Sequence, residues 1–126
     1  MQDFEFKGIW TSDIATIRVS LPLIAFEQEA ISIIYCPALE ISGYGNNENE
    51  ALDSFKIAFG EFFAYTMNRN TLYKELERLG WIIKKQGKPM TPPSMTKLLL
   101  ENENFSNIFN NYPFRKYNST LHIPAA

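Results

Sequence analysis

The chain has 126 residues, of which 45% are hydrophobic, and a formal net charge of −2. This composition excludes a disordered or highly charged class, and no apolar run is long enough for a transmembrane helix. A chain of this length buries about two-thirds of its unfolded surface around one core, so we expect a globular protein. The acidic balance is unfavourable for holding a phosphate backbone and favours a protein partner.

The first residues have neither the basic start nor the apolar core of a secretory signal, so we expect a cytoplasmic protein. Residues 4–7 alternate briefly and predict a short edge strand, and residues 8–13 have the composition of a turn. Between residues 17 and 23 the apolar side chains occupy the odd positions, which predicts a half-buried strand. After Leu23 the apolar side chains move from odd to even positions, at Ile24 and Phe26. We interpret this change as a bulge or a bend in the strand.

Pro22 indicates that the first long strand lies at a sheet edge, because proline has no N–H to donate. Residues 31–36 and 39–44 alternate as two further strands, and Pro37 separates them. Together with residues 17–26 they predict a three-stranded antiparallel meander, and residues 27–29 are the expected polar connection. Gly45 then supplies a backbone that turns sharply before the next element.

A long helix follows the meander. Asn47, with Glu50 three residues later, has the pattern of an N-cap and a capping box, so the helix should begin near Glu48. Its large apolar side chains recur every three or four residues as far as about Asn68: Leu52, Phe55, Phe59, Phe62 and Phe63. Such a wide face must cover the sheet, so the predicted fold class is α+β. The aromatic stripe is typical of a packed core rather than of a cofactor site.

Thr71 predicts the cap of a shorter helix that ends at Gly80, and residues 81–83 predict a strand. Residues 84–89 form a small basic patch, typical of a solvated hairpin edge and otherwise suited to phosphate. Ser94 is the expected cap of a helical region that is interrupted at residues 102–104 and ends at Pro113.

The tail from Phe114 to Ile123 alternates as a strand. We therefore expect a core of residues 1–90 and a C-terminal extension of residues 91–126. The extension should pack either on this core or on a second copy in a homodimer, because an exposed strand edge pairs unless it is blocked.

The sequence shows no pattern typical of a catalytic or metal-binding site. The chain has one His and one Cys, so it can form neither a His-based metal pair nor an internal disulfide. Its carboxylates show no paired pattern at adjacent strand ends, as a metal-dependent nuclease would need. We therefore predict no catalytic, cofactor-binding or metal-binding residues and no enzymatic activity, and we interpret Cys36 as a small core residue.

Residues 31–66 resemble the core of the HicB-like antitoxin family, which has a partial ribonuclease H-like fold. The residues that match the family pattern, which we expect to be structural, are Tyr35, Cys36, Pro37, Leu39, Gly45, Asn47, Glu50 and Ala51. Asn47 stands where the family usually has Thr, which keeps the capping oxygen. Asn49 replaces the first residue of a Glu pair, which removes one charge.

The resemblance implies a β-β-β-α-β core from a bacterial toxin–antitoxin system, which binds a small basic toxin ribonuclease and blocks its active site. The alternative is a stand-alone, non-catalytic oligomeric binding or scaffold module of the same fold, and an unrecognised hydrolase is the third possibility. Many HicB-like proteins carry a C-terminal DNA-binding domain. Here the two helices of a ribbon-helix-helix do not follow Ile123, so we expect no autorepression and no nucleic-acid partner.

Overall fold

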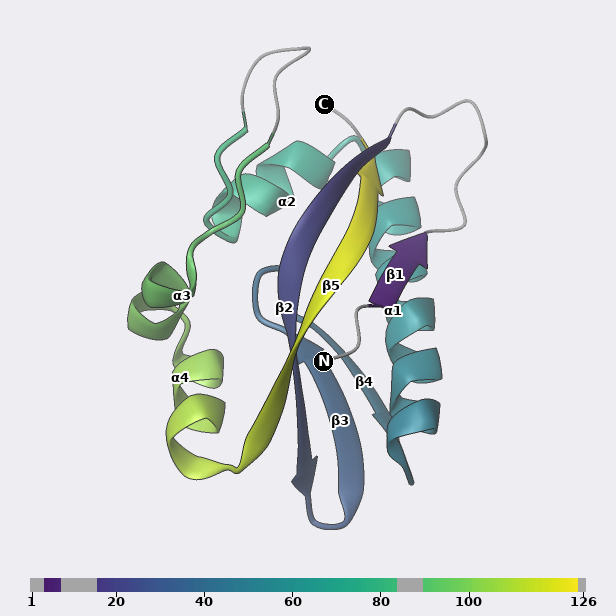
Figure 1. Ribbon diagram of the computed structural model, residues 1–126. Helices are drawn as coiled ribbons and strands as arrows, with labels where there is room; N and C mark the ends of the chain where they lie inside the picture. The colour runs from purple at the N-terminus through teal and green to yellow at the C-terminus, as the bar shows by residue number, and fades with distance from the viewer. Residues whose placement is uncertain (1–3, 8–15, 84–89, 125–126) are drawn as a thin grey trace.

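The computed structural model describes residues 4–7, 16–83 and 90–124 (Figure 1). The strands and helices are β1 (Phe4–Lys7), β2 (Thr16–Gln28), β3 (Ile31–Cys36), β4 (Ile41–Gly45), α1 (Glu48–Asn68), α2 (Leu72–Arg78), α3 (Met95–Glu101), α4 (Glu103–Asn111) and β5 (Phe114–Pro124). The predicted turn at residues 8–13 and the predicted basic patch at residues 84–89 lie outside the described residues. The α+β class is confirmed.

One sheet organises the chain, with the strand order β1-β5-β2-β3-β4. Strands β2, β3 and β4 are consecutive antiparallel neighbours, as expected for the meander. The sheet is larger than the three strands predicted, because β5 pairs antiparallel to β2 and β1 pairs parallel to β5 at the edge. The short edge strand expected at residues 4–7 is therefore present.

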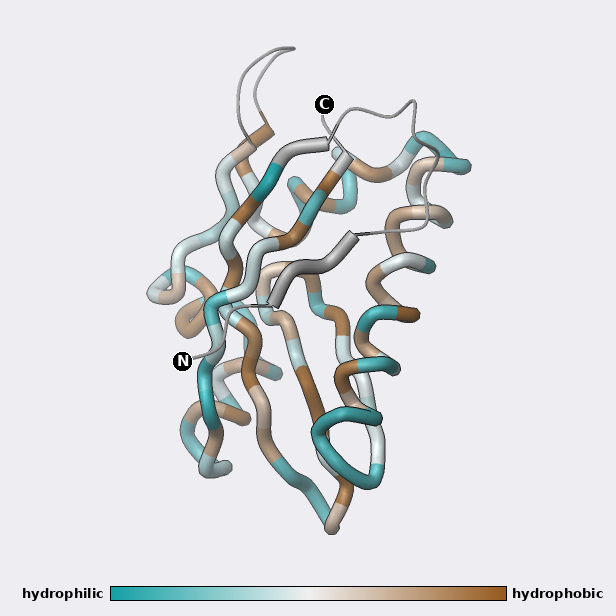
Figure 2. Tube along the Cα trace, turned by 45° about the vertical axis from the view of Figure 1, so that its right-hand side comes forward, coloured by the Kyte–Doolittle hydropathy of each residue, from teal (hydrophilic) through white to brown (hydrophobic). Residues whose placement is uncertain are grey.

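Helices cover both faces of the sheet, α1 on one side and α3 and α4 on the other (Figure 1). On the first face, Gly43 of β4 lies directly against the backbone of Ala51 and Phe55. On the second face, the ring of Tyr35 lies 6.4 Å from that of Phe105 in α4. Hydrophobic residues accordingly recur along the central strands, and hydrophilic residues gather where β4 leads into α1 (Figure 2).

The shift of apolar phase at Ile24 has a different cause from the predicted bulge. The pairing of β2 with β5 runs without interruption from Thr16 to Phe26. All four residues from Leu23 to Phe26 are buried, because the second face of β2 becomes covered there. A strand with one covered face alternates apolar and polar residues, whereas a strand covered on both faces has apolar residues at every position. Pro22 precedes the first residue of β2 that pairs with β3, so among the described strands β2 has only β5 beside it there.

Helix α1 begins at Glu48, as predicted. The Asn47 side-chain oxygen accepts a 2.9 Å hydrogen bond from the Glu50 amide, and the Glu50 carboxylate accepts a 3.0 Å bond from the Asn46 amide. Phe55 and Phe59 are fully buried, which confirms their predicted core position, whereas Phe62 is only half-buried. Each fully buried Phe contributes about 1.5–3 kcal/mol to stability.

The strand predicted at residues 81–83 is wrong. Ile82 forms only an isolated bridge with Thr91, away from the sheet. Trp81 is instead a packing residue, and its indole N–H donates a 2.8 Å hydrogen bond to the Ala38 carbonyl. An aromatic residue beside two isoleucines has high strand propensity, but burial of the indole decides its position here.

Helix α3 begins at its predicted cap, and α4 begins at residues 102–104, where only an interruption of the helical region was predicted. The Ser94 hydroxyl accepts from the Lys97 amide at the start of α3, and the Asn102 side chain accepts from the Phe105 amide at the start of α4. Helix α2 also follows its predicted residue, but the Thr71 side chain makes no capping bond. The tail forms β5 inside its own sheet, between β1 and β2, which is the first of the two placements expected for it.

Candidate functional site

The first four motif residues lie where β3 turns into β4. Tyr35 and Cys36 end β3, and Pro37 and Leu39 lie in the turn; all four are buried. Burial raises the pKa of the Cys36 thiol to about 12, so the thiol is protonated at neutral pH. This environment agrees with the interpretation of Cys36 as a core residue.

The other motif residues lie at the opposite end of β4, where α1 begins. Asn47 and Glu50 cap the helix, and Ala51 is buried against the sheet. A Cβ atom at Gly45 would lie 2.4 Å from the Glu50 Cβ, so only glycine allows this approach. The eight motif residues therefore form two groups that build the β3–β4–α1 unit, and they do not converge on one site.

A polar network that the motif does not contain surrounds Tyr35. The Tyr35 hydroxyl donates to the Glu40 carboxylate at 2.6 and 2.8 Å. The side-chain amide of Asn102 donates to both groups, and that of Asn104 donates to Glu40 at 3.3 Å. Burial, followed by the hydrogen bond to Glu40 and its charge, raises the pKa of Tyr35.

This network holds the start of α4 against the β3–β4 turn. Glu40 has a φ of 54°, a left-handed conformation that is uncommon for a residue with a side chain, and four hydrogen bonds hold its carboxylate. No sequence pattern predicts this network, because Asn102 lies 67 residues from Tyr35 along the chain. The raised pKa keeps the Tyr35 phenol protonated at neutral pH, so that it donates within this network.

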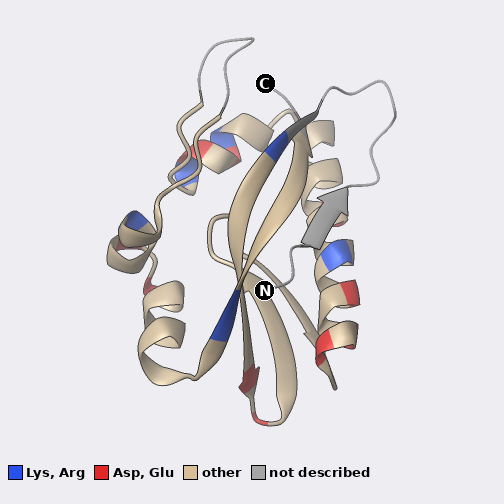
Figure 3. Cartoon of the chain, viewed as in Figure 1, with Lys and Arg blue, Asp and Glu red and all other residues tan. Residues whose placement is uncertain are grey.

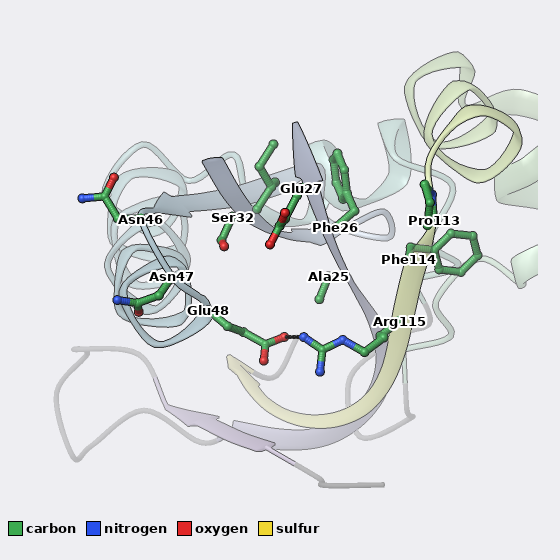
Figure 4. Close-up of a pocket in the computed structure, with 11 residues that line it drawn as sticks. Ala25, Phe26, Glu27, Ser32, Asn46, Asn47, Glu48, Pro113, Phe114 and Arg115 are labelled. Carbon is green, nitrogen blue, oxygen red and sulfur yellow. Dashed lines mark hydrogen bonds and ion pairs between the residues drawn. The ribbon is translucent and has the colours of Figure 1, made fainter. Parts of the chain in front are cut away.

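A cleft of about 680 Å³ opens beside the N-terminus of α1 (Figure 4). Glu27 and Ser32 line it from the β2–β3 hairpin, and Glu48 and Arg115 face each other across it, joined by a 2.5 Å ion pair. Tyr117 also donates to Glu48, at 2.7 Å. The Glu48 carboxylate at the start of α1 is thus paired with two side chains of β5.

The described residues contain no group of three or more His, Cys, Asp or Glu side chains that could hold a metal ion. In the same part of the chain, no helix has the length and apolar character needed to cross a lipid bilayer.

The surface with the clearest binding character runs along β4 and the adjacent flank of α1. We call it the β4 edge surface, and it consists of Tyr44, Glu50, Ser54, Ile57, Glu61 and Tyr65. Its large apolar side chains are strongly exposed: 58% for Tyr44 and 61% for both Ile57 and Tyr65. Ser54 connects helix and strand, since its hydroxyl accepts a 3.1 Å hydrogen bond from the Tyr44 amide.

Two acidic residues, Glu50 and Glu61, stand among these apolar side chains and are both exposed. Figure 3 shows acidic residues along the α1 ribbon. Exposed aromatic and aliphatic side chains with charges between them are typical of a protein-binding surface. The motif residues behind this surface support it: Gly45, Asn47 and Ala51 hold α1 close to β4.

Comparisons of this chain with protein-family models, with curated proteins and with solved structures gave no match. The functional assignment therefore depends on the motif residues of the β3–β4–α1 unit and on the β4 edge surface.

Proposed function

We propose that this chain is a HicB-like antitoxin, or a protein derived from one, which binds and neutralises a small basic toxin ribonuclease. The observation that carries the proposal is the β4 edge surface, where Ile57 and Tyr65 are exposed beside Glu61. Apolar contacts supply affinity, and carboxylates at such a surface attract a partner of positive charge. The motif residues around α1 support the family part of the proposal.

The chain itself has no catalytic role in this proposal. Its buried thiol and its buried phenol both have raised pKa values and belong to packing and hydrogen-bond arrangements. Neutralisation then depends on covering the partner's active site and not on chemistry. Purified protein mixed with RNA and Mg²⁺ should leave the RNA intact; cleavage that is lost on substituting a single acidic residue would contradict this.

The proposal is tested with the product of a short, basic reading frame adjacent to the gene. Co-expression should give a complex that survives size-exclusion chromatography, and adding this chain should suppress the RNA cleavage of the partner in proportion to the amount bound. The control is an unrelated acidic protein of similar size and charge, which should not suppress cleavage. A partner that cleaves RNA equally well in the presence of this chain would refute the proposal.

The second candidate is a stand-alone oligomeric binding or scaffold module. The exposed edge of β4 favours it, because an open strand edge also accepts a second copy of the same chain. Sedimentation of the purified chain separates the two candidates. A stable dimer that persists when the basic partner is added would favour the module, and a monomer that is captured in a heteromeric complex would favour the antitoxin.

A further inference from the structure

We propose that β4 is a strand-addition site, at which an extended segment of a partner protein rich in Lys or Arg pairs with the open edge of β4. This inference rests on the proposed function in that the partner is a basic protein. It names the surface that binds the partner and the backbone pairing that holds it.

Strand β4 lies at the end of the sheet and, among the described residues, has a strand beside it only on the β3 side. Residues of an antiparallel strand direct their backbone groups alternately toward one neighbour and the other. The Tyr44 amide points away from β3, because it donates to Ser54 in α1. Ser42, two residues earlier, therefore directs its N–H and C=O the same way, toward the position of an added strand.

Both faces beside this edge offer apolar contact. Ile57 and Tyr65 lie on the α1 flank, on one face of the sheet. Tyr44 lies on the other face, opposite Ile33 of β3, and Ile31, two residues before Ile33 on the same face, is 38% exposed. These are four of the seven large hydrophobic residues that are exposed in the described part of the chain. The side chains of an added strand would alternate between the two faces and meet apolar groups on each.

The charges of the β4 edge surface favour a basic segment as the binding partner. Glu50, Ser54, Ile57, Glu61 and Tyr65 recur every three or four residues on one side of α1, and this stripe contains two carboxylates and no Lys or Arg. Arg69 lies beyond the end of the stripe, and its guanidinium lies 5.3 Å from the Tyr65 ring centre. A second copy would bring carboxylates against carboxylates, whereas a basic segment would pair with them.

The probe is a capped hexapeptide of alternating lysine and valine, added to isotope-labelled full-length chain and followed by NMR. The amide signals of Ser42 and Tyr44 and those of Ile57 and Glu61 should shift together, in a saturable way. A peptide of alternating glutamate and valine should bind at least about tenfold more weakly. A lysine peptide with proline at alternate positions lacks the backbone donors and should not shift the β4 signals.

The matched variants change exposed positions, so the fold is retained. Ile57→Lys combined with Glu61→Lys should weaken binding of the lysine peptide by about tenfold or more. The control is Leu100→Lys, at a residue of α3 that is 81% exposed and away from this surface, which should leave binding unchanged. Equal binding of all three peptides, shifts confined to other strands, or an unchanged affinity of the double variant would each overturn the inference.

The same samples separate this inference from the proposed function. If the Ile57→Lys, Glu61→Lys variant neutralises a basic partner normally, the proposed function is supported and the strand-addition site at β4 is refuted. If the chain binds the lysine peptide at β4 but neutralises no partner, the strand-addition site is supported and the proposed function is refuted. Concentration-dependent loss of the Ser42 and Tyr44 signals without peptide would identify a second copy as the occupant and would overturn the choice of a basic partner.

Discussion

At the scale of single residues, Ser119 has an environment that does not suit its side chain. It lies on β5 and is only 1% exposed, and among the described residues its hydroxyl has no hydrogen-bond partner. A buried hydroxyl without a partner costs about 1–3 kcal/mol, because the group loses its bonds to water on folding. The surrounding residues are apolar, since its neighbour across the ladder is Leu21 and Leu121 follows two positions later.

We therefore predict that Ser119→Ala raises the free energy of unfolding by about 1 kcal/mol, by removing the unsatisfied hydroxyl. Urea unfolding of the two proteins measures the difference. Ser20→Ala, on the exposed face of the neighbouring strand, is the control and should change the unfolding free energy by no more than about 0.5 kcal/mol. A clear loss of stability in Ser119→Ala would show that the hydroxyl is satisfied after all.

Tyr35 makes stability depend on pH in the alkaline range. Burial and the Glu40 carboxylate raise its pKa above the ordinary value of 10.0, so the folded state holds the phenolic proton more tightly than the unfolded state. The stabilisation is complete below pH 10 and is lost as the pH rises toward the folded-state pKa, because the unfolded chain loses its proton first.

The prediction is that the free energy of unfolding falls above pH 10, and that Tyr35→Phe shows a smaller fall. Burial also raises the pKa of Tyr73 and Tyr117, so the difference between the two proteins isolates the contribution of Tyr35. At neutral pH, Tyr35→Phe should cost about 1–2 kcal/mol through the broken hydrogen bonds. Parallel pH profiles of the two proteins would contradict the pKa argument.

At the scale of elements, the close approach of β4 and α1 depends on Gly43. A Cβ atom there would lie 2.2 Å from the Phe55 nitrogen and 2.3 Å from the Ala51 oxygen. Both atoms belong to the helix backbone and cannot move without displacing α1. The contact also places Phe55 and Phe59 on the sheet, where both are fully buried.

Gly43→Ala should therefore destabilise the protein by about 2–3 kcal/mol or more, at the upper end of the usual cost of overpacking. Thermal and urea unfolding measure this loss. Leu100→Ala at the exposed position in α3 is the control and should stay within about 0.5 kcal/mol of the parent. If Gly43→Ala unfolded at the same urea concentration as the parent, α1 would have to lie farther from β4 than described here.

At the scale of the whole molecule, β5 lies inside the sheet rather than beside it. It pairs with β2 along its full length and also carries β1 through residues 119–122. Leu121 and Ile123 are fully buried. The C-terminal residues are therefore part of the same hydrophobic core as the Phe-rich face of α1.

A chain that ends at Pro113 should consequently fail to fold cooperatively, because β2 keeps only β3 as a partner and the core loses the buried side chains of Leu121 and Ile123. We expect the loss of dispersed NMR signals and of a sharp thermal transition. The control is a chain that ends at Pro124, which retains β5 and should unfold like the parent. A truncated chain with a cooperative transition would show that the extension is dispensable.

The sequence by itself determined the local elements. Asn47 and Ser94 mark helix starts because each side chain satisfies an amide three residues later. The phenylalanine spacing of α1 and the alternation of the tail identify their buried faces, since these periodicities follow from backbone geometry alone. The β3–β4–α1 unit could be placed for the same reason: its turn, cap and helix are consecutive in the chain.

Only the tertiary structure decided how these elements assemble. The insertion of β5 between β1 and β2, the covering of both faces of β2, and the bonds from Asn102 to Tyr35 and Glu40 join segments that are distant along the chain. The apolar phase shift at Ile24 and the strand propensity at Trp81 suggested other structures, because local patterns do not show which surface will be covered. The β4 edge surface likewise exists only once β4 is the last strand and α1 lies beside it.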